Sequence, residues 1–172
     1  MNRKTLGWNA AAAVFAYGFG QLSQLDYKYV GIDQLLGGVW PDNEAPAGSL
    51  DWTTGEPTAK YWVVRLLART IGTSEVKQLF HAQVSEPNAG YVLPFVMQSS
   101  SSKGLLLVNK QATPLTFNIS GVTGGSASCL DGSGLSTTPG MAPPIERRIT
   151  AEGSLTLGAF GVAVATVVLR TQ

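Results

Sequence analysis

The sequence predicts an α+β fold in which the terminal β/α unit of a (β/α)8 barrel is followed by a C-terminal antiparallel β-sandwich. One observation is the uneven spread of aromatic residues, since all four tryptophans lie before residue 75. After that point the chain turns to Val, Leu, Thr, Ser and Gly, and helical periodicity gives way to short alternating runs. We therefore divide the 172 residues into a barrel tail over 1–74 and a β-sandwich over 75–172.

The first unit is predicted to run helix, strand, loop, helix. Residues 5–25 have helical spacing and helix-favouring alanines, 27–36 form an apolar strand, and 39–55 are broken by prolines and glycine. Pro57 stands where a second helix begins, because its missing N–H would be unpaired there. This order is a fragment of an alternating α/β pattern. One strand makes no sheet, so we expect the earlier barrel strands to lie outside this chain.

The second unit is predicted to consist of seven or eight short strands joined by Gly and Pro turns, which is typical of an antiparallel sandwich. In the last run, Val162 and Val164 share one face, while Ala163 and Ala165 share the other. This alternation favours a strand over the alternative of a helix. The serine run 99–102 is interpreted as a hairpin tip. The predicted strands are 76–84, 91–98, 103–109, 115–119, 127–130, 145–150, 154–157 and 160–169.

Composition excludes several classes of function. Twelve Lys and Arg oppose eleven Asp and Glu, and no run of three basic residues exists, so the clustered positive charge of a nucleic-acid surface is missing. One cysteine, Cys129, excludes an internal disulfide and is interpreted as a small buried residue. One cysteine with one histidine argues against a conventional zinc site. Ser-His-Asp schemes would all need His81, which lies in a strand-like run. We expect no metal and no cofactor.

No stretch of eighteen uncharged apolar residues exists, so no transmembrane helix is predicted. The N-terminus leaves two interpretations open. Arg3 and Lys4 precede an apolar run over 6–20, as in a secretory signal peptide, but polar residues such as Asn9 suit a folded helix better. The sequon at Asn118 is a second, weak indication of a secretory route. We expect an extracellular or secretory localisation.

Several segments, taken in order, carry a family resemblance. They are FAYGFGQLSQL, VGIDQLLGG and GEPTAKYWVVRLLARTIG in the first unit, and GLLLVNKQATPLTFNISG and SLTLGAFGVAVATV in the second. With this order and spacing, the chain resembles the C-terminal part of the heparanase-like glycoside hydrolases, glycoside hydrolase family 79. Related barrel-plus-sandwich families, 39 and 51, fit less well and stay alternatives.

The resemblance implies a retaining glycosidase that hydrolyses O-glycosidic bonds of a polysaccharide or glycoconjugate. Such enzymes place two carboxyl groups about 5 Å apart, one as acid/base and one as nucleophile. In the family these groups end barrel strands four and seven, which would lie upstream of Met1. No residue of this chain matches either catalytic glutamate, so we expect the chain to be inactive alone.

The resemblance implies that some residues of this chain lie at the rim of the substrate-binding site of the barrel. Gln34 matches a family glutamine that hydrogen-bonds the sugar, and Trp40 falls where the family has an aromatic residue near it. Asp33 ends the same predicted strand, and it departs from the basic residue of heparanase, which argues against an anionic substrate. The alternatives are that Gln34 pairs with loop backbone and that Trp40 packs over the barrel rim.

Other functions stay open beside the partial glycoside hydrolase. The chain could be a secreted, non-catalytic module whose sandwich binds carbohydrate or protein, or a structural remnant without independent function. The sandwich sequence offers no aromatic cluster from which to argue a separate binding site. The loop acids Asp42, Glu44, Asp51 and Glu56 are interpreted as helix caps or solvated groups rather than a catalytic pair.

Overall fold

The computed structural model describes residues 3–25, 36–37, 48–51, 55–70, 76–97, 103–131 and 143–170. Most of the predicted strand over 27–36 and the serine run 99–102 lie outside these ranges. The elements are α1 (Arg3–Ser23), β1 (Leu36–Gly37), β2 (Leu50–Asp51), α2 (Ala59–Thr70), β3 (Val76–Leu79), β4 (Gly90–Met97), β5 (Lys103–Asn109), β6 (Leu115–Asn118), β7 (Val122–Leu130), β8 (Ile145–Ile149), β9 (Ser154–Leu157) and β10 (Val162–Leu169).

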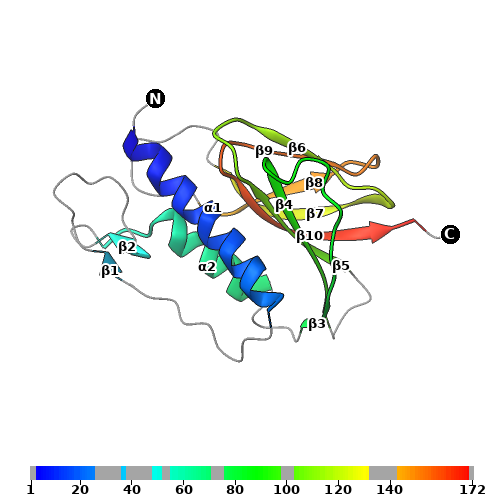
Figure 1. Ribbon diagram of the computed structural model, residues 1–172, viewed down its shortest axis with the longest axis horizontal. Helices are drawn as coiled ribbons and strands as arrows, with labels where there is room; N and C mark the ends of the chain where they lie inside the picture. Colours follow the sequence, from blue (N-terminus) through cyan, green and yellow to red (C-terminus); the bar gives the residue numbers. More distant parts are fainter. Residues whose placement is uncertain are drawn as a thin grey trace.

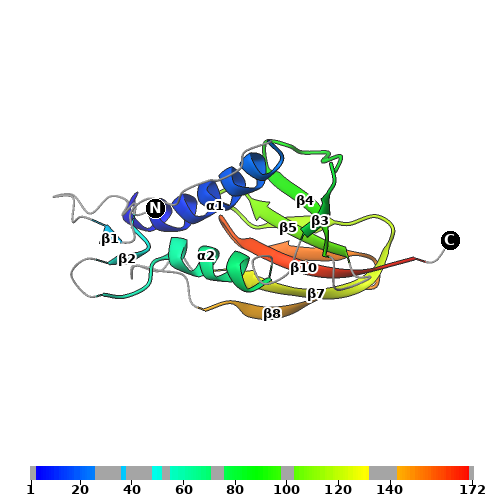
Figure 2. The same cartoon turned by 90° about the horizontal axis from the view of Figure 1, so that it is seen from below.

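The fold is a layered α+β arrangement around one antiparallel sheet. Six strands follow the order β3-β4-β5-β10-β7-β8, and both helices lie on the same side of this sheet (Figures 1 and 2). On its other face packs the antiparallel pair β6–β9, while β1 and β2 form a separate parallel pair. The predicted α+β class is confirmed. The barrel unit and a full sandwich stay predictions, because the second sheet has two strands among the described residues.

Strand β10 is the centre of the sheet and is buried on both faces. Val162 and Val164 belong to the apolar cluster under the helices, and Ala163 and Ala165 belong to the cluster under β6–β9. The alternation of side chains along a strand sends neighbouring residues to opposite faces. The sequence prediction of a strand with a large-residue face and a small-residue face is therefore right, and the helical alternative is wrong.

Strand β3 is shorter than predicted, since it ends at Leu79 rather than at residue 84. The amide of Phe80 still donates to the carbonyl oxygen of Pro94 on β4, at 2.9 Å. In an antiparallel ladder, the residue at position 94 would also donate its backbone N–H to the carbonyl oxygen of Phe80. Pro94 has no backbone N–H, so this second bond is missing. The ladder therefore stops at this position, and His81 is exposed and outside the strand.

Strand β7 is longer than predicted, because it begins at Val122 rather than at residue 127. Its first half contains Gly124, Gly125 and Ser126, which have low intrinsic preference for strands. Close approach to β10 explains Gly125, because a Cβ atom there would collide with the carbonyl oxygen of Thr166. Tertiary packing thus extends the strand across residues whose local preference argues against it.

One apolar cluster joins the helices to the sheet. Val63, Leu66 and Leu67 of α2 are buried against the same cluster as Leu130 and Val162. The predicted boundary near residues 72–75 therefore separates two sequence compositions, whereas the described parts on either side share a core. The division into 1–74 and 75–172 stays a prediction.

Helix α1 approaches the sheet through small residues and a tyrosine contact. Gly20 lies against the ring of Tyr91 on β4, and the side-chain amide of Gln24 donates to the Tyr91 hydroxyl at 2.9 Å. Tyr17 meets the Tyr91 ring edge-on, with ring centroids 5.0 Å apart. Burial raises the pKa of Tyr91, because the phenolate would lose hydration there. These contacts fix the end of α1 on the sheet.

Asn109, at the end of β5, connects two turns from a fully buried position. Its amide nitrogen donates to the carbonyl oxygens of Thr113 and Gly158, at 2.8 and 2.7 Å, and its side-chain oxygen accepts from the Gln111 amide at 2.9 Å. A buried amide is stable only when such partners are present. Asn109 is the asparagine of the VNK segment that contributes to the family resemblance.

Two glycines of α1 give a matched test of its packing. A Cβ atom at Gly20 would lie 2.5 Å from the Tyr91 ring, whereas a Cβ atom at Gly18 would meet nothing within 4 Å. Both Gly→Ala changes favour the helix by up to about 1 kcal/mol. We expect Gly18→Ala to raise the free energy of unfolding and Gly20→Ala to lower it by about 1–3 kcal/mol through overpacking. Urea denaturation measures both, and equal stability of the two variants would contradict this packing.

Asn109 and Asn118 give a second matched pair, because Asn109 is buried whereas Asn118 is exposed on β6. Asn109→Ala leaves buried carbonyl groups without donors, so we expect it to lower the free energy of unfolding by about 2–4 kcal/mol. Asn118→Ala should change it by less than about 0.5 kcal/mol. Thermal unfolding followed by circular dichroism distinguishes the two. A comparable loss in both variants would show that the Asn109 network is not specific.

Candidate functional site

The predicted rim residues Asp33, Gln34 and Trp40 lie outside the described residues, as do Asp42 and Glu44. The structure therefore does not test how the rim is arranged. The nearest described segment is β1, whose Leu36 and Gly37 pair in parallel with β2.

Individual residues considered as catalytic or metal-binding do not form a site in the described ranges. No group of three or more His, Cys, Asp or Glu residues that could hold a metal is found among them. Cys129 is fully buried, as expected, and burial raises its thiol pKa to about 11, so the thiol stays protonated at neutral pH. Of the helices in these ranges, none combines the length and apolar character needed to span a bilayer.

The first turn of α2 is fixed by Thr58, which is buried. Its hydroxyl oxygen accepts from the Tyr61 amide at 3.4 Å, and its carbonyl oxygen accepts from the Trp62 amide at 3.2 Å, as expected of an N-cap. The Thr58 hydroxyl also donates toward the carbonyl oxygens of Gly48 and Ser49. The helix therefore starts at Ala59, and the prediction that Pro57 is its first residue is wrong by two positions. An uncharged hydroxyl, rather than one of the loop acids, caps the helix.

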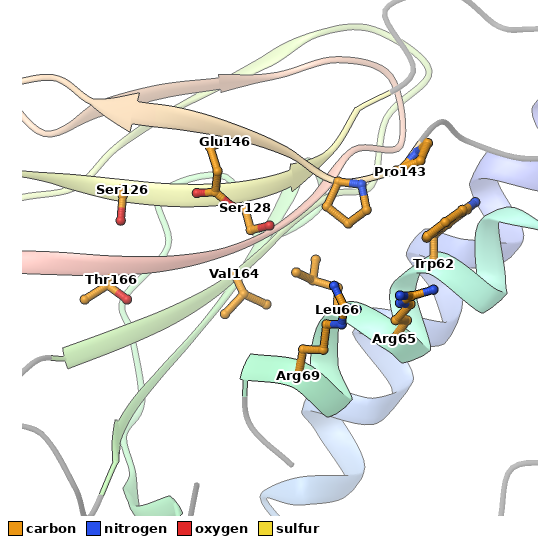
Figure 3. A pocket seen from close by; sticks show the side chains of 11 residues that line it. Trp62, Arg65, Leu66, Arg69, Ser126, Ser128, Pro143, Glu146, Val164 and Thr166 are labelled. Carbon is orange, nitrogen blue, oxygen red and sulfur yellow. The ribbon is translucent and has the colours of Figure 1, made fainter. Parts of the chain in front are cut away.

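A cavity of about 560 Å³ lies between α2 and the sheet strands β7, β8 and β10, and we call it the α2 cleft. In Figure 3 the helix residues lie on one side and the strand residues on the other. One wall is formed by four residues of α2 at spacings of three and four, which share one helix face. These residues are Trp62, Arg65, Leu66 and Arg69.

Arg65 is held in place within this wall by aromatic contacts. Its guanidinium lies 5.6 Å from the ring centroid of Trp62 and 6.0 Å from that of Tyr61. It also donates to the Tyr61 hydroxyl at 3.1 Å. The Tyr61 and Trp62 rings are themselves edge-on, with centroids 5.2 Å apart. A planar cation that is stacked and hydrogen-bonded loses less freedom when it binds a further group.

The sheet wall of the α2 cleft is polar, because the pairing of β7 with β8 and β10 places hydroxyl and carboxyl groups next to one another. Ser128 pairs with Glu146 across β7 and β8, and Ser126 pairs with Thr166 across β7 and β10. Directly opposed residues of neighbouring strands point to the same face. Val164 shares this face and continues into the apolar core beneath Leu66. The wall is completed by Pro143 and Pro144.

Strand β8 is an edge strand, and an ion pair fixes it at this wall. The Arg147 guanidinium lies 2.6 Å from the carboxylate of Asp131, whose side chain is 3% exposed. The same carboxylate accepts from the Gly158 amide at 2.9 Å. Because Arg147 follows Glu146 on the strand, this pairing holds the Glu146 backbone beside β7.

Sequence reasoning did not identify the α2 cleft. Trp62 and Leu66 have the spacing of an apolar helix face, and the sandwich sequence offers no aromatic cluster from which to argue a binding site. Two signals were present in hindsight: arginines at 65 and 69 on the same face as Trp62, and a change from valine to threonine at 166 along the large-residue face of β10. Neither indicates which strand lies opposite the helix, which depends on the sheet order.

No protein-family model and no curated protein matches this sequence. Solved structures do match in fold, and three of them are 15–18% identical to this chain. A glycoside hydrolase family 30 subfamily 8 xylanase, Xyn30A from Clostridium acetobutylicum, is 18% identical with a TM-score of 0.59, over 94% of this chain and 39% of that chain. An arabinose-bound family 51 α-L-arabinofuranosidase is 15% identical with a TM-score of 0.60, over 95% and 28%.

The catalytic domain of the family 30 xylanase C from Talaromyces cellulolyticus is also similar, at 15% identity and a TM-score of 0.55, over 91% of this chain and 34% of that chain. The chain thus spans between about a quarter and two fifths of the length of these three proteins. It has the fold of a portion of these glycoside hydrolases.

Proposed function

We propose that this chain is the C-terminal portion of a retaining glycoside hydrolase that cleaves O-glycosidic bonds of a polysaccharide or glycoconjugate. The sequence segments favour the heparanase-like family 79, or a related family such as 39, as the parent. The fold shared with part of the family 30 and 51 proteins supports a glycoside hydrolase origin. The catalytic glutamate pair would belong to the part of the parent enzyme that precedes these residues.

The observation that carries this proposal is the uncovered apolar side of α1. No Lys, Arg, Asp or Glu occurs from residue 5 to 25, so this part of the helix has no charged face to turn toward solvent. One side packs through Ala12, Ala13 and Ala16 into the core. On the other side of this 21-residue helix, the side chain of Val14 is 68% exposed. We call Ala11, Val14, Gly18 and Leu22 of α1, with Leu25 in the turn that follows it, the outer stripe of α1.

The outer stripe is where we place the missing neighbour. Helices of a (β/α)8 barrel form a ring in which each helix has neighbours on both sides. Here α1 contacts α2 on one side, and Val14 and Leu25 are the exposed large apolar residues on the other. The preceding barrel helix, supplied by the rest of the parent enzyme, would cover them.

The α2 cleft does not supply the hydrolytic chemistry itself. Retaining hydrolysis needs two carboxyl groups about 5 Å apart. Glu146 is the one carboxylate among the described residues that line the cleft. This supports a role for the chain in completing the parent enzyme rather than in acting alone.

Within that enzyme, we assign Asp33, Gln34 and Trp40 to the substrate-facing rim. Catalytic sites of such barrels form at the C-terminal ends of the strands, where these residues are expected. The Gln34 amide would exchange hydrogen bonds with a sugar hydroxyl, and the Trp40 ring would lie against the apolar face of a pyranose. The exposed Asn118 of the sequon supports passage through the secretory pathway.

The second candidate is a secreted module without catalysis. The α2 cleft favours it, because the cleft could bind a ligand without catalysis. The packing of α1 into the core argues against it. Signal-peptide cleavage near residue 20 would remove Ala12, Ala13 and Ala16 from the core cluster. N-terminal sequencing of the secreted product separates the two candidates. A mature chain that begins near residue 20 would support the module and oppose the partial enzyme.

The proposed hydrolase function predicts that the isolated chain is inactive and that the chain becomes active when the rest of the barrel is supplied. The purified chain should hydrolyse no aryl glycoside, whereas co-expression with the preceding barrel portion of a family 79 enzyme should restore turnover. Gln34→Ala should then lower kcat/KM by about tenfold, the cost of one lost hydrogen bond with its desolvation. Gln78→Ala, on exposed β3, is the control and should have no effect. Turnover by the isolated chain that disappears on mutating a loop acid would contradict the proposal.

The outer stripe predicts self-association of the isolated chain, because a wide apolar surface in water favours contact. Val14→Glu should reduce the sedimentation-derived mass toward the monomer. Val168→Glu, at a valine that is 60% exposed on β10, is the matched control and should leave association unchanged. Both changes should alter stability by less than about 0.5 kcal/mol. A monomeric wild-type chain would show that the stripe is not a contact surface.

A further inference from the structure

We infer that the α2 cleft binds a segment of a neutral oligosaccharide, through a site formed wholly by residues of this chain. The cleft combines an aromatic wall, two guanidinium groups, a row of hydroxyl groups and one carboxylate. Its volume of about 560 Å³ falls within the range of about 300–1,000 Å³ typical of small-molecule sites.

The chemistry of the walls matches a sugar ring. The Arg65 guanidinium only donates hydrogen bonds, the Glu146 carboxylate only accepts them, and the hydroxyl of Ser128 does both. A sugar presents adjacent hydroxyl groups that each donate and accept. A donor-only group and an acceptor-only group on opposite walls can therefore both be satisfied by one ring, with the serine and threonine hydroxyls between them.

The polar groups of the sheet wall are available for a ligand. Ser126, Ser128, Thr166 and Glu146 have no hydrogen bond or ion pair to another side chain in the ranges that the structure describes. Arg65, in contrast, is already oriented by its contacts with Tyr61 and Trp62. The prearranged Arg65 lowers the cost of ordering the site on binding, and the sheet wall has no side-chain partner among the described residues that a ligand would need to displace.

Arg69, the second guanidinium of the lining, already takes part in an interaction of its own, so Arg65 and Glu146 are the charges that decide which ligand is favoured. A sulfate, phosphate or uronate drawn to Arg65 would lie across the cleft from a carboxylate of the same sign. Like charges in one site oppose binding and set specificity. A neutral saccharide faces no such repulsion and gives the carboxylate a hydroxyl donor.

The choice of a saccharide among neutral polar ligands rests on the proposed function. The binding site itself is argued from the residues of the cleft and does not require the chain to be catalytically active. In the proposed enzyme α2 would be the final helix of the barrel, so the cleft would lie in the outer ring of helices rather than among the loops at the strand ends where hydrolysis occurs. A polymer held there would be anchored to the enzyme without being cleaved at the point of contact.

The test is calorimetric titration of the full chain with xylohexaose and cellohexaose, beside trigalacturonate and inorganic sulfate. We expect at least one neutral hexamer to bind, with weaker binding of the two anions. Arg65→Lys and Glu146→Gln should each weaken the neutral ligand by about tenfold or more, as when a charged hydrogen bond is lost. Arg170→Lys and Glu86→Gln, at exposed positions outside the cleft lining, are the matched controls and should bind as the wild type does.

Three outcomes would overturn the inference: no binding of either hexamer, tighter binding of trigalacturonate or sulfate, or equal weakening in the control variants. Circular dichroism of each variant confirms that the fold is retained, and Arg65→Lys preserves charge if a larger change disrupts α2. In the completed enzyme, the same cleft variants should leave turnover of a short aryl glycoside unchanged. Binding without turnover would uphold the cleft while refuting the hydrolase, and turnover without binding would do the reverse.

Discussion

The structure depends on the burial of β10 on both of its faces. In its first half, Val162 and Val164 belong to the core beneath the helices, and Ala163 and Ala165 belong to the core beneath β6–β9. Valines fill the first core, where two helices must be supported, whereas alanines at 163 and 165 leave room for the leucines of β9. A single strand thus fixes the spacing of three layers, and a change of register by one residue would exchange its large and small faces.

The helices attach to this sheet by two different means. Helix α2 buries a conventional apolar face, with Val63, Leu66 and Leu67 inside the core. Helix α1 uses alanines and Gly20, which allow its backbone to approach the ring of Tyr91 closely. Phe15, Tyr17 and Phe19 also pack against this core, whereas Val14 and Leu25 stay exposed. The exposure of Val14 and Leu25 is therefore a direct consequence of how α1 packs.

The α2 cleft arises where the apolar pattern of the sheet ends. Along the helix-facing side of β10, valine at 164 is followed by threonine at 166, and the paired positions on β7 are serines. Polar residues there cannot be covered by α2 without losing hydrogen bonds to water. The helix and the sheet consequently diverge at this point. The ion pair of Arg147 with Asp131 keeps β8 beside the opening, so that Glu146 faces the arginines of α2.

Sequence alone determined the elements whose signals are local. The span of α1, the limits of β5 and β9 and the alternation along β10 follow from residue periodicity, because side-chain burial at these positions repeats with the period of the element itself. The order of the segments was also enough to suggest a glycoside hydrolase. Tertiary structure decided what depends on neighbours: Pro94 ends β3, close approach to β10 carries β7 through two glycines, and the buried partners of Asn109 explain the VNK segment. The cleft belongs to the same group, since it exists only because the order of strands in the sheet places Ser126, Ser128 and Glu146 opposite one face of α2, and no local pattern encodes that order.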